Sequence, residues 1–252
     1  PQQMFGALVK NFLPEKIGVP ADKICQVSIM PCVAKKFENN RPEMESENGR
    51  DVDIVLTTRE AAKLFKLRGI NLATIQPESF DDFMGEGTGA ARIFGTTGGV
   101  MEAALRTVVW KLTGGQVDTI DYHAARGYRG VKEASVWIGD LEVKVAIVNG
   151  IGNVKAVMDD VRAGKSPYHF IEVMACPGGC LNGGGAPLLS EPVQVADRMK
   201  KMYDSDANNK IRRSHENLQV QKLYEEYLKE PCGHISHHLL HTHYVDRSGE
   251  VK

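Results

Sequence analysis

Two features that decide many function classes are scarce in this sequence: an excess of one charge sign and a long apolar run. The 252 residues contain 31 Lys and Arg against 32 Asp and Glu, so the net charge is only −1. This balance gives no basis for nucleic-acid binding or for attraction to a membrane surface. No stretch approaches the 18 or so apolar residues of a membrane-spanning helix, so we expect no membrane span.

Cysteine is also sparse, and its number is odd. The five cysteines lie in short motifs, which argues against a secreted domain built on a disulfide framework. Residue 1 is Pro and not Met, so we expect that the chain has been trimmed or excised and that any targeting signal went with the missing part. The expected location is cytoplasmic.

Strands alternate with helices along most of the chain. Short apolar runs bounded by Gly, Pro or Asn predict strands at 24–30, 53–58, 143–150 and 170–174. Apolar spacings of three and four residues predict helices at 1–13, 101–112 and 154–161. Residues 117–139 predict antiparallel strands. This alternation favours an α/β fold with parallel sheets made of βαβ units.

The carboxyl-terminal part has a different character. Residues 188–252 predict a helical tail, with amphipathic helices at 193–203 and 215–228. Two single residues also carry expectations: Thr58 as the cap of the helix that follows the second strand, and Cys25 as a core residue within the first strand.

Two of the apolar runs lead into loops that carry thiols. The run at 170–174 precedes Cys176-Pro-Gly-Gly-Cys180, and the run at 24–30 precedes Cys32. Gly178 and Gly179 lack a Cβ atom, so the backbone between the two thiols can bend tightly and approach a bulky group. Open α/β sheets bind ligands at the carboxyl ends of their strands. We therefore expect a site for an inorganic group at these loops.

Soft thiolate ligands favour iron–sulfur clusters, zinc or copper(I). Three cysteines fall one short of the four that a 4Fe–4S cluster normally takes. A structural zinc site also needs four closed ligands, and no good fourth one lies near the motifs. In the tail, His234, His237, His238 and His241 share a helix face; a zinc or nickel site there is conceivable, but a solvated helix is favoured.

The glycine-rich segment 77–99 is the tempting place for a nucleotide. It contains no Gly-Lys-Ser/Thr and no complete dinucleotide fingerprint, which disfavours phosphate binding. We expect instead that this segment covers the inorganic group held by the cysteines and that Phe94 packs nearby.

The cysteine motifs resemble the second and third signature motifs of the iron-only (di-iron) hydrogenases. Residues 30–38 read Met-Pro-Cys-Val-Ala-Lys-Lys-Phe-Glu, and residues 174–180 read Met-Ala-Cys-Pro-Gly-Gly-Cys. Residues 1–6, 93–102 and 239–244 are similar to the same family, so the resemblance spans the chain. Ala186 stands where the family usually has Gln. The family's first motif, a Thr-Ser-Cys-Cys-Pro run, does not occur in these 252 residues.

The resemblance implies a cofactor and its ligands. Cys32, Cys176 and Cys180 match the cysteines that ligate a 4Fe–4S cubane, and Cys180 matches the one that also bridges to a di-iron subcluster with CO, cyanide and a dithiolate bridge. Gly178, Gly179 and Pro1 are expected to border this cofactor. For the fold, the resemblance implies two parallel-sheet halves flanked by helices with the cluster site between them.

The resemblance also implies roles around the di-iron unit. Lys35 matches the lysine that donates a hydrogen bond to a cyanide, and Glu38 is expected to hold Lys35 in place. Met30 and Met174 are expected to form a soft wall that excludes water. Phe94 and Gln2 complete the set of residues that we expect to act at the site.

The activity implied is the reversible conversion of H2 to protons and electrons. The fourth cubane ligand and the proton-relay cysteine belong to the absent first motif, so an upstream segment or another subunit must supply them. No Cys-x2-Cys-x2-Cys run is present, so a ferredoxin-like carrier is expected to exchange electrons. The whole chain then reads as the carboxyl-terminal portion of a hydrogenase catalytic domain. The alternative is a hydrogenase-like protein without turnover, either an iron–sulfur assembly factor or a sensory homologue.

Overall fold

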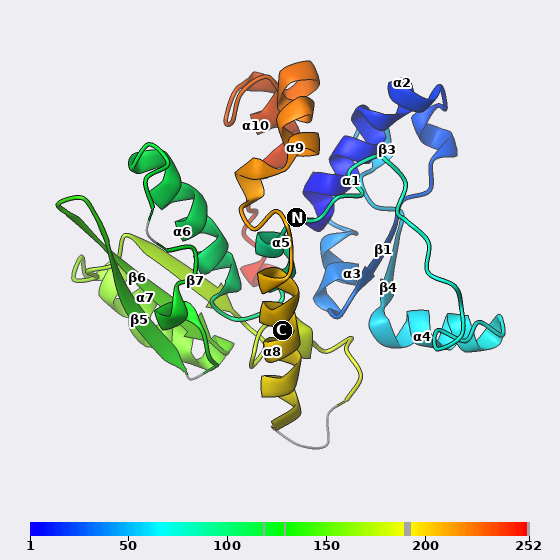
Figure 1. The fold of residues 1–252 in the computed structure, drawn as a ribbon. Helices are drawn as coiled ribbons and strands as arrows, with labels where there is room; N and C mark the ends of the chain where they lie inside the picture. The colour runs from blue at the N-terminus through cyan, green and yellow to red at the C-terminus, as the bar shows by residue number, and fades with distance from the viewer. Residues whose placement is uncertain (118, 129, 189–192, 251–252) are drawn as a thin grey trace. The chain divides into compact units, whose positions relative to one another are not determined.

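A computed structural model describes residues 1–117, 119–128, 130–188 and 193–250. The chain divides into two compact units (Figure 1). Unit 1 contains Pro1–Glu78 together with Gln219–Lys252, and unit 2 contains Ser79–Leu218. Both units mix helices with parallel strands, which confirms the α/β fold class. Each unit is described by itself.

Unit 1 is built on a two-stranded parallel sheet. Strand β1 (Val27–Met30) pairs with β4 (Ile54–Thr57) in the register Val27 to Ile54. Around these strands lie α1 (Gln2–Asn11), α2 (Leu13–Ile17), α3 (Ala34–Glu38), α4 (Thr58–Leu67), and the short hairpin of β2 (Glu45–Ser46) and β3 (Gly49–Arg50). The 3-10 turns of unit 1 are Ala21–Lys23, Pro42–Met44 and Ser248–Glu250.

Helix α1 is fixed to the sheet of unit 1 by buried polar contacts. Ser28 Oγ donates to Gln2 Oε1 at 2.7 Å. The Lys10 ammonium, only 4% exposed, donates to the Ile24 carbonyl at 2.6 Å and forms an ion pair with Asp53 at 2.8 Å. A buried lysine is tolerated here because its charge is met by a carboxylate and a carbonyl.

The last residues of the chain belong to unit 1. Helix α9 (Leu218–Leu223) continues into the π-helical turn Tyr224–Leu228, and α10 (His234–Leu240) follows. The helix predicted at 215–228 is confirmed in part: helical structure runs from Leu218 to Leu228, but a 3-10 turn (Ser214–Glu216) stands at the predicted start and the last turn is π-helical. The π turn packs on α1 and α2 through the Phe12 and Tyr227 rings, 4.9 Å apart, and the Lys16–Glu226 ion pair at 2.7 Å.

Unit 2 contains a three-stranded mixed sheet of order β5-β6-β7. Strand β5 (Val131–Ile138) pairs antiparallel with β6 (Leu141–Asn149), and β6 pairs parallel with β7 (Phe170–Met174). Helix α7 (Val154–Arg162) connects β6 to β7, so this half contains the predicted βαβ unit. Of the antiparallel strands predicted over 117–139, only β5 forms. A 3-10 turn, His123–Ala125, precedes it, and residues 118 and 129 lie outside the described residues.

The core of unit 2 lies between the sheet and α6 (Gly99–Leu112). Met101, Leu105 and Val109 of α6 pack against Val145 and Ile147 of β6. The intervening residues Ala146 and Val148 are also fully buried, so β6 is covered on both faces. This explains why the strand reads as a continuous apolar run instead of an alternating one.

Helix α8 (Val193–Ala207) joins unit 2 through α5 (Gly89–Ile93) and through buried charges. Asp206 of α8 accepts two hydrogen bonds from Arg106 of α6, each 2.7 Å long. Arg106 also donates to Glu102 at 2.9 Å, and all three side chains are at most 1% exposed. Asp121, Arg126 and Arg212 extend this set into a network of alternating charges.

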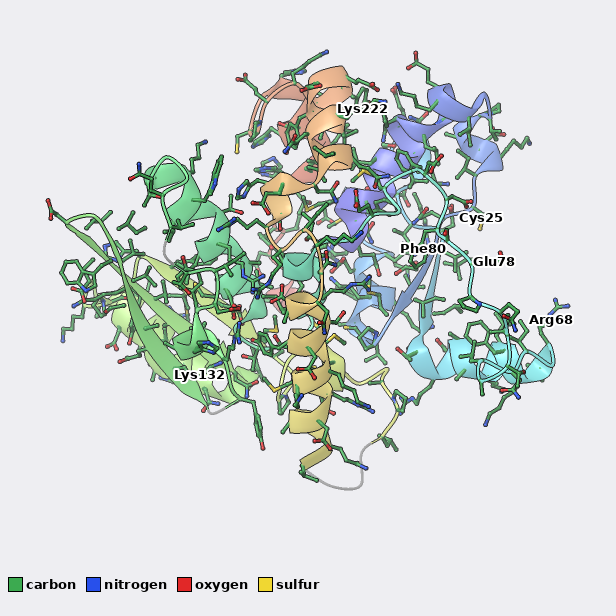
Figure 2. The ribbon with its side chains drawn as sticks, viewed as in Figure 1. Cys25, Arg68, Glu78, Phe80, Lys132 and Lys222 are labelled. Atoms are coloured by element: carbon green, nitrogen blue, oxygen red, sulfur yellow. The ribbon has the colours of Figure 1, made fainter. Side chains whose placement is uncertain are left out.

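Two predictions about single residues were wrong. The cap of α4 is Thr57, whose side chain accepts from the Glu60 N–H while the Glu60 carboxylate accepts from the Thr57 N–H. Thr58 is the first helical residue. Cys25 precedes β1 and is exposed, not buried within the strand (Figure 2).

Candidate metal centre

The Cys176–Cys180 loop begins two residues after β7 ends. Cys180 opens a 3-10 turn, Cys180–Asn182. Cys176 is half-buried and Cys180 is exposed. No disulfide joins any of the five cysteines, all of which lie among the described residues. The two thiols of this loop therefore keep their capacity to bind a metal.

Hydrogen bonds hold this loop from both sides. The Gly178 N–H donates to Asn149 Oδ1 at 3.0 Å, and the Gly178 carbonyl accepts from the Thr97 N–H at 3.0 Å. The Leu181 N–H donates to the Gly95 carbonyl at 2.9 Å. Asn149 ends β6, so the loop is fixed to the sheet and to the glycine-rich segment together.

The two glycines of the loop are required by its conformation. Gly178 and Gly179 have φ of 87° and 103°, which side chains rarely allow. A Cβ atom on Gly179 would lie 2.6 Å from the Thr97 nitrogen and 2.7 Å from the Gly95 carbonyl oxygen. The glycines thus let the loop lie directly on residues 95–97, at the carboxyl end of segment 77–99. That this segment also covers a bound group stays a prediction.

Two apolar residues predicted to act at the site, Met174 and Phe94, are close in sequence to this contact. Met174 ends β7, two residues before Cys176, and is half-buried. Phe94 caps α5 immediately before Gly95, whose carbonyl binds the loop. Met174 thus leads into the loop, and Phe94 is next to a residue that the loop contacts.

In unit 1, Cys32 occupies the short connection between β1 and α3. Met30 is the last residue of β1, and α3 begins two residues after Cys32. Lys35 and Glu38 form an ion pair within α3, each about a quarter exposed. This is the contact expected between the two residues, and the role of the pair at the site stays a prediction.

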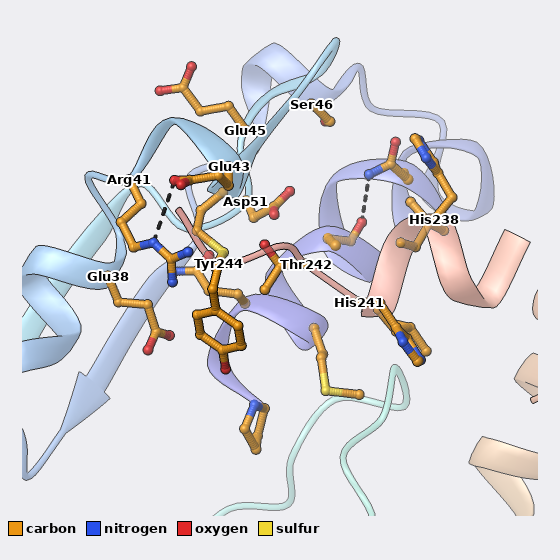
Figure 3. Close-up of a pocket in the computed structure, with 18 of the residues that line it drawn as sticks. Glu38, Arg41, Glu43, Glu45, Ser46, Asp51, His238, His241, Thr242 and Tyr244 are labelled. Carbon is orange, nitrogen blue, oxygen red and sulfur yellow. Dashed lines mark hydrogen bonds and ion pairs between the residues drawn. The ribbon is translucent and has the colours of Figure 1, made fainter. Parts of the chain in front are cut away.

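Gln2 and Pro1 lie at the start of α1. The Gln2 side chain is 5% exposed; its oxygen accepts from Ser28, but its nitrogen is buried with no hydrogen-bond partner in the structure. Such an orphaned donor is costly, and it fits a site that receives an acceptor from a bound group. Pro1, Lys35 and Glu38 line a pocket of about 780 Å³ in unit 1 (Figure 3).

Two buried polar residues, Gln3 and Asp51, also line this pocket. Gln3 is 8% exposed, and neither atom of its amide has a partner. Burial raises the pKa of Asp51 to about 6, Lys10 acts against this rise, and Glu45 adds to it. Five acidic residues border this pocket: Glu38, Glu43, Glu45, Glu47 and Asp51.

The three thiols are ligands of the type that an iron–sulfur cluster takes. Cys32 belongs to unit 1, and Cys176 and Cys180 belong to unit 2. Their convergence on one cluster stays a prediction. Among the residues that the structure describes, no group of three or more His, Cys, Asp or Glu side chains is arranged as a metal site. This includes the tail histidines, where the rings of His237 and His241 instead stack at 4.5 Å.

Sequence reasoning missed Asn149 and Thr97, which bond the cysteine loop, and Glu172, which bonds residues 98 and 101 next to it. The Glu172 carboxylate accepts from the Gly98 and Met101 N–H groups. A signal was present for two of them. Glu172 is a charge inside an apolar strand, and Asn149 is a polar residue that ends one. Such residues are tolerated at buried positions only when they are bonded.

Comparisons with known proteins agree with the motifs. Residues 1–184 match the family model described as "Iron only hydrogenase large subunit, C-terminal domain", and residues 193–247 match "Iron hydrogenase small subunit". The chain is 47% identical over 248 residues to the NADP-reducing hydrogenase subunit HndD of Solidesulfovibrio fructosivorans, covering 98% of this chain and 42% of that protein.

Further relatives include enzymes and assembly factors. A periplasmic [Fe] hydrogenase large subunit of Nitratidesulfovibrio vulgaris is 51% identical over 198 residues, covering 79% of this chain and 47% of that one. The cytosolic Fe-S cluster assembly factor narfl of Xenopus tropicalis is 30% identical, covering 97% of this chain and 52% of the factor. The chain thus spans about half the length, or less, of these relatives.

Among solved structures, the chain is similar to [FeFe]-hydrogenase HydA1 of Chlamydomonas reinhardtii. The TM-score is 0.82 at 38% identity, covering 97% of this chain and 69% of that one. None of the helices in the described part of our chain is both long enough and apolar enough to cross a bilayer.

Proposed function

Because this chain belongs to the family of iron-only hydrogenase large subunits, we propose that it is the carboxyl-terminal portion of a catalytic domain that converts H2 reversibly to two protons and two electrons. The observation that carries this proposal is the Cys176–Cys180 loop, held on glycines with positive φ and bonded on both sides. A loop fixed in this way presents two thiols with little reorganisation.

The proposed ligands are Cys32, Cys176 and Cys180. They would hold a 4Fe–4S cluster as thiolates, with Cys180 also bridging to a di-iron subcluster that carries CO, cyanide and a dithiolate. When bound, this cofactor supplies the cleavage of H2 and the path for its electrons. The protein contributes the ligands, their orientation and a dry environment.

Lys35 and Gln2 are the polar residues that we propose to face this cofactor. The Lys35 ammonium is already oriented by Glu38, and a positive donor suits an anionic ligand on a metal. The buried Gln2 nitrogen is a second donor without a partner in the protein. Both would bind acceptor atoms that the cofactor brings.

Met30, Met174 and Phe94 are proposed to exclude water around the cofactor. Met30 and Met174 each lie two residues before a cysteine, Phe94 directly precedes Gly95, and none carries a group that competes for protons. Gly178 and Gly179 would let the cofactor approach the backbone, and Pro1 would close the side of the pocket that it shares with Lys35.

The proposed partners follow from the share of the relatives that the chain covers. A longer polypeptide or a second subunit would supply the fourth cluster cysteine and the proton-relay cysteine, and a ferredoxin-like protein would exchange electrons. The division at residue 188, with a helical tail after it, stays a proposal. So does a cytoplasmic location, since the name of one relative includes the word periplasmic.

Substitution of Cys180 tests the proposal. In the full open reading frame that encodes this chain, matured with its cofactor, Cys180→Ser should abolish the infrared bands of CO and cyanide. Cys232→Ser, which changes an exposed thiol outside both loops, is the matched control and should retain them. Bands that persist in Cys180→Ser would remove this residue from its proposed role.

A second function is favoured by the relatives named as assembly factors. A protein of that kind would bind a cluster without converting H2. Evolution of H2 with a reduced dye separates the two functions. Lys35→Ala should lower activity or cofactor occupancy about 10–100-fold in a hydrogenase, and it should have little effect where a cubane alone is bound.

A further inference from the structure

Glu172 is a buried carboxylate to which neither motif assigns a role. It lies on β7, four residues before Cys176, and its side chain is 6% exposed. Its two oxygens accept from the Gly98 N–H at 2.6 Å and from the Met101 N–H at 2.7 Å. Gly98 immediately precedes α6, and Met101 lies in the first turn of that helix.

These bonds reduce the cost of burying the charge. The pKa of Glu172 is raised above its ordinary value, because burial outweighs the N–H groups of Gly98 and Met101 and the positive charge of Lys132, which act in the opposite direction. The positive end of the α6 dipole faces the same carboxylate. Lys132 itself donates to the Ala125 carbonyl at 2.7 Å, so the bonded partners of Glu172 are the Gly98 and Met101 N–H groups and not Lys132.

The segment that Glu172 holds is the one on which the cysteine loop lies. The Thr97 N–H, one residue before Gly98, donates to the Gly178 carbonyl. Gly95 accepts from the Leu181 N–H. A closed circuit results: β7 leads covalently to the cysteine loop, the loop bonds residues 95–97, and residues 98–101 bond back to β7 through Glu172.

We propose that Glu172 is a positioning residue for the loop that carries Cys176 and Cys180, and that its negative charge lowers the reduction potential of the cluster held there. This proposal rests on the proposed function. The anchor follows from the closed circuit of bonds. The electrostatic effect follows from a fixed anion in an interior of low dielectric, where charges act over longer distances than in water.

Two variants distinguish the positioning role of Glu172 from the effect of its charge. Glu172→Ala removes both, whereas Glu172→Gln keeps the shape and one acceptor but removes the charge. Glu133→Gln is the matched control, because Glu133 is an exposed carboxylate on the neighbouring part of the same sheet. All three variants are made in the full open reading frame and purified without oxygen.

Three measurements test the proposal. Hydrogen exchange at the Gly98 and Met101 amides should become about 10–100-fold faster in Glu172→Ala, as expected for loss of a hydrogen bond to a charged group. Iron content per chain should fall in the order wild type, Gln, Ala. The midpoint potential of the cluster, read by spectroscopic redox titration, should rise in Glu172→Gln and stay unchanged in Glu133→Gln.

The outcomes are distinguishable. Wild-type exchange and wild-type potential in both variants would overturn the proposal. If Glu172→Gln lost iron but kept the wild-type midpoint potential, Glu172 would contribute only to general stability, and the proposal would also be overturned. A wild-type protein that holds no iron would instead refute the proposed function, and the exchange rates would still decide whether Glu172 anchors the segment.

Discussion

The two units present their cysteines in different ways. In unit 2, Cys176 and Cys180 lie on a glycine loop that is bonded to Asn149 and Thr97. In unit 1, Cys32 lies in a short connection whose direction is set by the elements on each side. There, Lys36 ties α3 to β4 by donating to the Val55 carbonyl at 3.0 Å. Hydrogen bonds to the Cys176–Cys180 loop itself therefore fix that loop, whereas the position of Cys32 depends on the elements before and after it.

The units also treat buried charge differently. In unit 2, Arg106, Glu102 and Asp206 neutralise one another, and Glu172 is met by backbone N–H groups. In unit 1, the pKa of the buried Asp51 rises to about 6. Burial raises the pKa of Glu172 as well as that of Asp51, so bonds to N–H groups reduce the cost of a buried carboxylate without removing it.

The largest expected effect is loss of a charge from the network of unit 2. Asp206→Ala leaves the buried guanidinium of Arg106 without its main partner and should lower the free energy of unfolding by about 3–5 kcal/mol. Urea unfolding followed by circular dichroism measures it. Asp159→Ala, which removes an exposed partner of Lys155, is the control and should change little. Equal effects of the two variants would contradict the comparison.

The next effect concerns the glycine loop. Gly179→Ala places a Cβ atom 2.6 Å from the Thr97 nitrogen at a φ of 103°, and should cost about 2–4 kcal/mol. Gly95→Ala is the matched control, since its Cβ atom would have no neighbour within 4 Å. Thermal unfolding compares the two. A Gly179 variant as stable as the control would show that the loop can relax away from residues 95–97.

A gain of stability is expected in unit 1. Because the pKa of Asp51 is about 6 in the folded protein against 3.8 as its ordinary value, the folded state binds more protons and stability falls as pH rises through this window. Asp51→Asn should therefore stabilise the protein by about 1–3 kcal/mol at pH 7.5. The gain should vanish below pH 4. If the stabilisation by Asp51→Asn did not change with pH, its cause would be packing and not the charge of Asp51.

The smallest effect separates two neighbouring threonines. Thr57→Ala removes the cap of α4 and should cost about 1 kcal/mol. Thr58→Ala changes the first helical residue and should be close to neutral, because alanine favours helix. Chemical denaturation of both variants tests this. A larger loss of stability in Thr58→Ala than in Thr57→Ala would identify Thr58 as the cap, as the sequence alone predicts.

Much of the local structure could be predicted because it depends on residues close in sequence. The apolar runs that became β4, β6 and β7 are bounded by breakers, and Gly178 and Gly179 are the residues that a tight loop requires. The errors have local causes too. Thr57 and Thr58 are both acceptable caps, and only the reciprocal bond with Glu60 selects the first.

The sequence by itself determined the chemistry available to this protein: three thiols in two motifs, a lysine and a glutamate placed to pair, and glycines between the ligands. Only the tertiary structure decided what holds that chemistry in place. Arg106 and Asp206 are 100 residues apart, and Glu172 meets Gly98 across 74. Sequence spacing cannot identify partners this far apart, because they are determined by packing and by the cost of leaving a buried charge unbonded.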